Sequence, residues 1–283
     1  MAPRRRGATV AVVRRPGRTT LLALGIGAVA AGAAATALVL VGRGGGHRRP
    51  TAVTPRPRPA PPPGPVRLAN VRGGGGWVAL LRGDVVARGA PTPGAAAVLA
   101  VNGRNPYSGD RQALMVTGAY RARSGRHWLR VLVPARPNGA SGWIPRSAVA
   151  SMTERRVVVR AHLAGKRVEV WRDGRRVAAW PAGIGRSATP TPTGRFAVYE
   201  TVAVPAAEQA TYGRYIVALT AHSDVVRLLD GQDPVVAFHG TGAAGAVRLD
   251  APSSLGCLIL ADAPLAALTR LAPPGTPVEI LPA

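Results

Sequence analysis

A charge-free apolar run over residues 19–41 constrains this chain more than any other feature of its sequence. At about 1.5 Å per residue, a helix of this length spans the roughly 30 Å apolar core of a bilayer. Arginines precede the run and favour a cytoplasmic location for the basic tail at residues 1–18. We therefore expect a single-pass cell-membrane protein whose remaining residues lie outside the cytoplasm. The length of the run favours an uncleaved signal anchor over a cleaved signal peptide.

A linker rich in glycine and proline follows at residues 42–66. Proline favours the extended polyproline conformation, so the stretch at 50–66 could reach roughly 50 Å at about 3.1 Å per residue. Folded structure is therefore expected only beyond the linker, in two regions at 67–150 and 153–283.

The chain is strongly basic, with 37 basic and 13 acidic residues and a net charge of +24. No acidic residue occurs among residues 1–67, so much of this excess flanks the apolar run or lies in the linker. Because no nucleic-acid-binding motif is present, we expect no nucleic acid as a partner. The basic outer part is instead expected to favour anionic polymers.

Both outer regions show short apolar runs separated by turns. Residues 131–133 and 142–145 flank a Pro-Asn-Gly turn and predict a hairpin. Residues 168–171 and 177–180 flank Asp173-Gly174 and predict a second hairpin, because Asp-Gly readily adopts the positive φ that a tight turn requires.

The second region also contains candidate elements around a histidine. Residues 235–238 predict a strand that leads directly into His239. Asp262 is expected to cap a short helix over residues 263–271, and residues 278–281 predict a last strand. The expected fold class is mainly β with one or two short helices.

Cys257 is the only cysteine, which excludes a disulfide within the chain. A thiol acts as a nucleophile when a base lies within hydrogen-bond reach, and His239 is the candidate base. Cys257 follows Gly256 in a Ser-Ser-Leu-Gly-Cys turn. Glycine lets the backbone turn sharply, so consecutive N–H groups can converge on an oxyanion. These parts fit a cysteine acyltransferase, with an inert buried thiol as the alternative.

The segment resembles the L,D-transpeptidase catalytic domain family (YkuD type), whose signature is a histidine followed by a Ser/Thr-His-Gly-Cys turn. The matching positions are His239, Gly240 and Thr241 at the start, and Ser254, Gly256 and Cys257 in the turn. Residues 183–196, 212–213 and 272–281 agree with further family segments. The resemblance implies an L,D-transpeptidase-type β domain at 153–283. Residues 67–150 resemble the small SH3-like β module that often precedes it, and a plain spacer is the alternative for that module.

The resemblance also implies a reaction that needs neither a metal nor an organic cofactor. Cys257 would attack the diaminopimelate carbonyl of a peptidoglycan stem tetrapeptide. His239 would take the thiol proton and later protonate the departing D-alanine. The Gly240 carbonyl would orient the imidazole, and N–H groups of Gly256 and Cys257 would hold the oxyanion. An amine of a neighbouring stem would then close the cross-link, with anionic cell-wall polymers as further partners.

Three residues are weaker candidates for contacts with the substrate. Ser254 is more often a turn residue than a substrate contact. Tyr212 is equally well explained by packing, and Thr241 is a candidate because it matches the family's His-Gly-Thr start. A fourth residue, His222, reads as a loop residue that could line the cleft. Thr-Pro-Thr-Pro at 189–192 reads first as a rigid turn.

Two positions depart from the family pattern. Leu255 stands where the family has a histidine, and Ile259 stands where it has arginine or asparagine. The alternatives are therefore a wall-binding relative with weak or no activity, and an L,D-carboxypeptidase that passes the acyl group to water.

Overall fold

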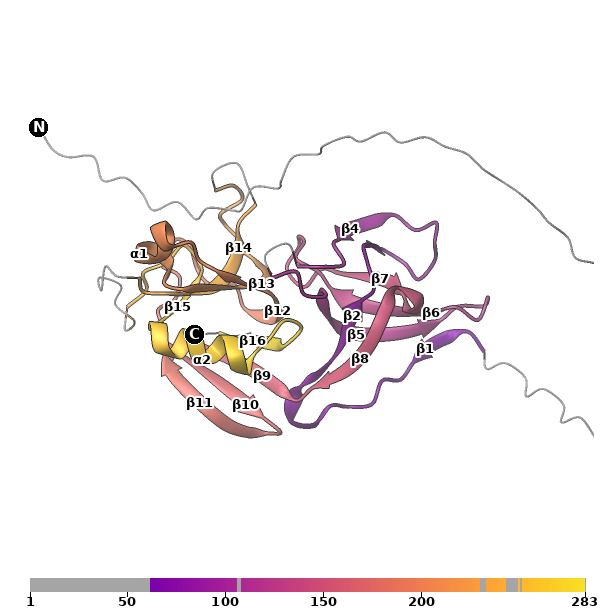
Figure 1. The fold of residues 1–283 in the computed structure, drawn as a ribbon, viewed down its shortest axis with the longest axis horizontal. Coiled ribbons are helices and arrows are strands. Elements are labelled where there is room, and N and C mark those ends of the chain that lie inside the picture. Colours follow the sequence, from indigo (N-terminus) through magenta and orange to yellow (C-terminus); the bar gives the residue numbers. More distant parts are fainter. Residues whose placement is uncertain (1–61, 106–107, 230–232, 243–248, 250, 283) are drawn as a thin grey trace, which may run out of the picture. The chain divides into compact units, whose positions relative to one another are not determined.

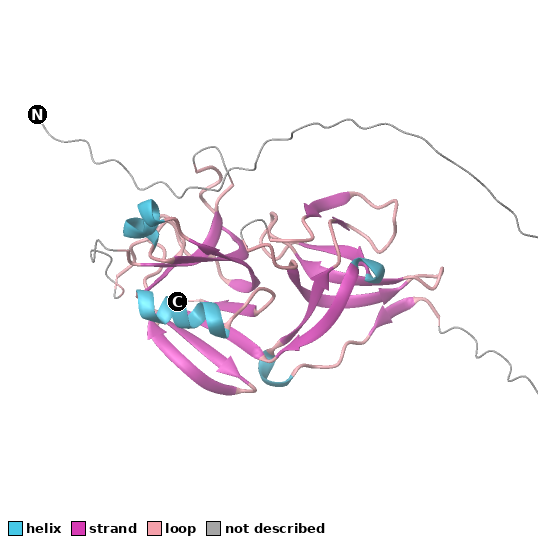
Figure 2. Cartoon of the chain, viewed as in Figure 1, coloured by secondary structure: helices cyan, strands magenta, loops and turns pink. Residues whose placement is uncertain are grey.

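The computed structural model describes residues 62–105, 108–229, 233–242, 249 and 251–282, all within one compact unit. They form two β-sheets and two short α-helices (Figures 1 and 2). The fold is therefore mainly β, as predicted. The predicted tail, the membrane segment at 19–41 and nearly all of the linker lie outside the described residues. In the described part of the chain, no helix is both long and apolar enough to cross a membrane.

The first sheet is antiparallel and runs in the order β4-β3-β7-β6-β5-β2-β8, with β1 paired to β5. Its strands are β1 Gly64–Val66, β2 Gly76–Leu81, β3 Val85–Arg88, β4 Ala97–Val101, β5 Ala113–Arg121, β6 His127–Leu132, β7 Ser141–Pro145 and β8 Val149–Arg155. Short 3-10 turns lie at Arg72–Gly74 and Arg146–Ala148. The predicted hairpin over 131–145 is confirmed as β6 and β7. The likeness of this module to SH3 domains stays a prediction.

The second sheet runs in the order β11-β10-β9-β16-β12-β13-β14-β15. Its strands are β9 Val157–His162, β10 Arg167–Arg172, β11 Arg175–Pro181, β12 Gly194–Ala203, β13 Tyr215–His222, β14 Val235–Gly240, β15 Leu258–Leu260 and β16 Pro277–Leu281. A 3-10 turn at Ala206–Glu208 leads into α1, Gln209–Tyr212, and α2 covers Asp262–Leu271. Most pairs are antiparallel, but β9–β16 and β14–β15 are parallel.

The predicted elements of this sheet are largely confirmed. The Asp-Gly hairpin is β10 and β11, with φ of 52° at Asp173 and 80° at Gly174. The strand before His239 is β14, and the last strand is β16.

The prediction that Asp262 caps the helix is wrong. Asp262 is the first residue of α2, Ala261 holds the N-cap position, and no side chain caps the helix. The chain leaves β15 at Leu260 and starts the helix one residue earlier than expected. The Asp262 carboxylate lies instead against the backbone of Gly213 and Gly240.

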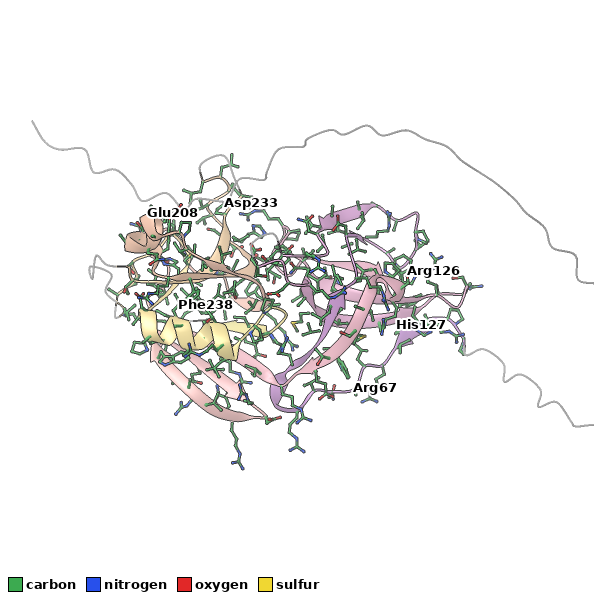
Figure 3. The ribbon with its side chains drawn as sticks, viewed as in Figure 1. Arg67, Arg126, His127, Glu208, Asp233 and Phe238 are labelled. Atoms are coloured by element: carbon green, nitrogen blue, oxygen red, sulfur yellow. The ribbon has the colours of Figure 1, made fainter. Side chains whose placement is uncertain are left out.

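The core of the second sheet is aliphatic and lies partly under α2. Leu265 and Leu268 sit one turn apart on one face of α2, which packs against β13 and β14. The same core contains Phe238, which Figure 3 shows in the interior. Burying each such side chain contributes about 1.5–3 kcal/mol, so this packing helps to hold β14 against α2.

Candidate active site

The parallel pair β14–β15 brings the chain segments that carry the candidate base and nucleophile side by side. Phe238 is level with Leu258, and His239 is level with Ile259. Phe238 and Leu258 both enter the core, so the side chain of His239 points to the opposite face. Cys257 immediately precedes Leu258, and the backbone of Ala237, two residues before His239, forms a hydrogen bond to its sulfur.

His239 is oriented by its own neighbour in the chain. Its Nδ1 lies 2.9 Å from the Gly240 carbonyl oxygen. Because a carbonyl only accepts, Nδ1 carries the proton and the Nε2 lone pair is left as the acceptor. The ring of Tyr212 packs edge-on against the imidazole, with centroids 5.6 Å apart. Burial lowers the pKa of His239, and the bond to Gly240 only partly opposes this effect. The imidazole is therefore neutral near pH 7 and able to accept a proton.

Cys257 is partly exposed, and neighbouring protein atoms shield its thiol from water. This burial raises the pKa of the thiol, while a hydrogen bond from the Ala237 backbone acts in the opposite direction. Thiol and imidazole are thus both neutral at rest. A thiolate would form by proton transfer as the reaction starts, rather than as a standing ion pair.

The turn before Cys257 is closed by the Ser254 hydroxyl. It donates to the Cys257 carbonyl at 2.6 Å and accepts the Gly256 N–H at 3.1 Å. Both functions of the hydroxyl are thus used within the turn. The Gly256 N–H donates to Ser254, so the N–H of Cys257 is the remaining candidate donor to an oxyanion. Gly256 has a φ of 123°, which residues with a side chain rarely adopt.

A second chain segment holds this turn from outside. The Thr189 hydroxyl donates to the Ser254 carbonyl at 3.1 Å, and the Ile184 carbonyl accepts the N–H groups of Ser253 and Ser254. Gly183 and Ile259 form two backbone hydrogen bonds with each other, each 2.9 Å long, and Ile259 lies two residues after Cys257. The sequence suggested only a rigid Thr-Pro turn here, since no spacing signals a contact across 65 residues.

The other predicted positions are distributed around this centre. Thr241 directly follows β14 and is half-buried. Leu255 is 37 % exposed, so this apolar side chain is partly open to solvent. Ile259 is buried beside His239, and it adds to the apolar surroundings that keep the imidazole neutral. His222 was predicted as a loop residue, which is wrong, because it is the buried last residue of β13.

The rest of the described chain offers no comparable site. Among the described residues, no group of three or more His, Cys, Asp or Glu side chains is arranged to hold a metal ion. A cavity of about 350 Å³ is lined by Arg155, Tyr199 and Pro273, but neither His239 nor Cys257 lines it.

Comparison with known proteins identifies the region that carries this centre. Residues 155–280 match the YkuD family, the L,D-transpeptidase catalytic domain. This YkuD domain contains the whole β14–β15 pair, the turn before Cys257 and the segment at 183–191 that holds this turn from outside. No curated protein sequence matches the chain.

Several solved structures are similar at low identity. An L,D-transpeptidase from Mycobacterium smegmatis is 17 % identical, with 56 % of this chain and 91 % of that chain covered and a TM-score of 0.34. L,D-transpeptidase 3 from Mycobacterium tuberculosis is 15 % identical. The match covers 56 % of this chain and 92 % of that chain, with a TM-score of 0.37. The Ldtfm–avibactam carbamoyl enzyme is 18 % identical. The match covers 46 % of this chain and 50 % of that chain, with a TM-score of 0.34. The chain therefore spans about half the length of that last protein.

Proposed function

We propose that this protein is a peptidoglycan L,D-transpeptidase, a cysteine acyltransferase that uses Cys257 as nucleophile and His239 as base. The observation that carries the proposal is the register of β14 and β15 within a YkuD domain. This register supports the proposal, because Cys257 directly precedes Leu258, which is level with the residue before His239. The Gly240 carbonyl sets which nitrogen of His239 can accept a proton.

The proposed reaction follows from the protonation states at this centre. The thiol of Cys257 transfers its proton to Nε2 of His239, and the sulfur attacks the diaminopimelate carbonyl of a stem tetrapeptide. The N–H of Cys257 stabilises the oxyanion, and the Gly256 N–H joins it only if its bond to Ser254 yields. The imidazolium then protonates the departing D-alanine. The rest of the stem peptide stays bound to Cys257 as a thioester. An amine of a neighbouring stem attacks the thioester, loses a proton to His239 and releases the thiol.

The decisive experiment uses the full-length protein with a purified disaccharide-tetrapeptide. We expect release of D-alanine together with a cross-linked dimer, both absent in Cys257→Ala. Cys257→Ser is the matched control, because it keeps the shape of the side chain but is a much weaker nucleophile. Equal traces of D-alanine from the wild type and Cys257→Ala would refute the proposal.

The products also separate the two alternative functions. Free tripeptide without dimer would identify an L,D-carboxypeptidase that passes the acyl group to water. Retention on peptidoglycan without either product would identify a wall-binding relative, the function that the substitutions Leu255 and Ile259 would favour. Acylation of the single cysteine by a carbapenem, seen as a mass shift, tests the nucleophile directly.

The setting of this activity is part of the same proposal. The apolar run at 19–41 is proposed to anchor the chain in the cell membrane, with the YkuD domain outside the cytoplasm. Protease treatment of intact cells should therefore degrade the outer part, and an intact chain would contradict this placement. Anionic wall polymers are proposed as further partners, and binding that does not weaken with added salt would argue against them.

A further inference from the structure

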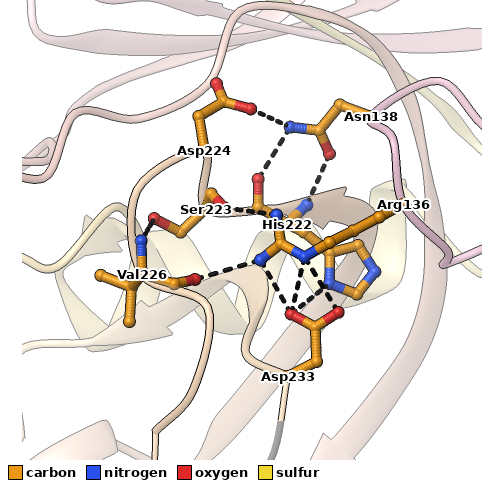
Figure 4. Close-up of polar contacts among 7 residues, drawn as sticks. All are labelled: Arg136, Asn138, His222, Ser223, Asp224, Val226 and Asp233. Atoms are coloured by element: carbon orange, nitrogen blue, oxygen red, sulfur yellow. Dashed lines mark hydrogen bonds and ion pairs between the residues drawn. The ribbon is translucent and has the colours of Figure 1, made fainter.

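The loop between β6 and β7 of the first sheet reaches the connection between β13 and β14 of the YkuD domain (Figure 4). Arg136 places its Nε 3.0 Å from both carboxylate oxygens of Asp233 and its Nη2 2.8 Å from one of them. Its Nη1 donates to the Ser223 carbonyl at 2.7 Å, and Nη2 donates to the Val226 carbonyl at 3.0 Å. One guanidinium thus ties both ends of the β13–β14 connection together.

Asn138 holds the same connection at the last residue of β13. Its side-chain oxygen accepts the His222 N–H at 2.8 Å, and its amide donates to the His222 carbonyl at 2.8 Å. The amide also donates to Asp224 at 2.9 Å. The side chain of Asn138 therefore pairs with His222 as a peptide group of a neighbouring strand would.

Charge supports this contact. The Asp233 carboxylate lies between Arg136 and Nδ1 of His222, which is 3.2 Å away. Burial alone would raise the pKa of Asp233, but the bond from Arg136 and the nearby charges of His222 and Arg136 lower it overall. The carboxylate is therefore ionised at neutral pH and available to hold the guanidinium.

The connection held in this way borders the turn before the nucleophile. A Cβ placed on Gly256 would lie 3.9 Å from the Ser223 hydroxyl on one side and 3.4 Å from the Pro190 carbonyl oxygen on the other. Ser223 is buried and accepts the Val226 N–H at 3.1 Å, so its position depends on the same segment that Arg136 binds. Asp233 lies two residues before β14, the strand that ends in His239 and contacts the sulfur through Ala237.

We propose that Arg136 and Asn138 are positioning residues for the proposed acylation of Cys257. They set the corner at His222 and Ser223 against Gly256, and they fix the start of β14. The first β module is then part of the acyltransferase rather than a spacer. This inference rests on the proposed function for its kinetic test, although the contacts themselves do not.

The test measures carbapenem acylation of Cys257 in the full-length protein over a range of carbapenem concentrations, which separates the maximal acylation rate from the apparent binding constant. Arg136→Ala and Asn138→Ala should each lower the maximal rate about tenfold or more, because small misplacements of reacting groups are costly. The apparent binding constant should change much less. Arg126→Ala is the matched control, an exposed arginine in the turn between β5 and β6 of the same module (Figure 3). It should behave as the wild type does.

Folding is controlled by recording tryptophan fluorescence at the assay temperature. If Arg136→Ala does not fold, Asn138→Ala and Arg136→Lys decide, since lysine keeps the charge but cannot reach Asp233 and two carbonyls together. Folded Arg136→Ala or Asn138→Ala that acylates at the wild-type rate would overturn the inference. If the wild type itself is not acylated, the proposed function fails. The positioning inference is then tested by amide hydrogen exchange over residues 251–260. Faster exchange in Arg136→Ala supports positioning, and unchanged exchange refutes it.

Discussion

Replacing Glu169 with glutamine should make stability less dependent on pH. Glu169 lies in the middle of β10, and its side chain is only 4 % exposed. It accepts from Trp171 at 2.9 Å, Arg176 at 2.9 Å and Arg167 at 3.0 Å, and His162 lies 3.2 Å away. Burial alone would raise the pKa of Glu169, but these four partners outweigh burial and lower it from 4.5 to about 2.

The size of the effect follows from this difference in pKa. At about 1.4 kcal/mol for each pKa unit, the interval from 4.5 to about 2 corresponds to roughly 3 kcal/mol. The side chains of Arg167 and Arg176 are 45 % and 55 % exposed, so solvent screens the charges. We therefore expect the ionised carboxylate of Glu169 to stabilise the fold by about 1–2 kcal/mol. Because the pKa of the carboxyl is lowered by folding, this contribution is present above about pH 4.5 and is lost as the pH falls towards 2.

The assay is urea unfolding of the wild type and Glu169→Gln at pH 7, 4.5 and 2. The variant should be less stable by about 1–2 kcal/mol at pH 7, and the two free energies of unfolding should converge at pH 2. Acylation of Cys257 should not change, since β10 and β14 are far apart in the strand order. Equal stabilities at pH 7, or a difference that persists unchanged at pH 2, would refute the reasoning.

Two further predictions concern the turn and the base. Gly256→Ala should destabilise the fold by about 1–3 kcal/mol, because its φ of 123° strains any side chain, and it should slow carbapenem acylation; wild-type melting and kinetics would contradict this. The acylation rate should be constant near neutral pH and fall in acid with a midpoint below 6.5, because burial lowers the pKa of His239 and the imidazolium cannot accept a proton. A midpoint above 6.5 would contradict the assignment of His239 as the base, and His239→Gln should remove the acid limb of the profile.

The hairpins and the strand before His239 could be predicted because local sequence determines them. Asp173-Gly174 adopts the positive φ values that such a turn requires, whatever the rest of the chain does. The order of the strands could not be predicted in the same way. The parallel register of β14 and β15 joins residues about 20 apart in the chain, and no local pattern encodes it.

The contacts around the candidate site were the least predictable. Thr189 and Ser254 meet across 65 residues, and Arg136 and Asp233 meet across 97. Each pair consists of ordinary polar residues in turns, which a single sequence cannot distinguish from solvated ones. The start of α2 was predicted one residue too late. Asp is a residue type that often caps helices, but Asp262 is the first residue of α2 and its carboxylate lies against Gly240.

The strand that carries the nucleophile has a consequence for how folding of this protein can be followed. β15 is only three residues long, and it takes its hydrogen bonds from β14 on one side and from Gly183 on the other. The surroundings of the sulfur are therefore complete only after β14, β15 and the segment at Gly183 have assembled. Since Cys257 is the sole thiol, a change in its rate of labelling by a small alkylating reagent would report on formation of the contacts around β15, without any introduced probe.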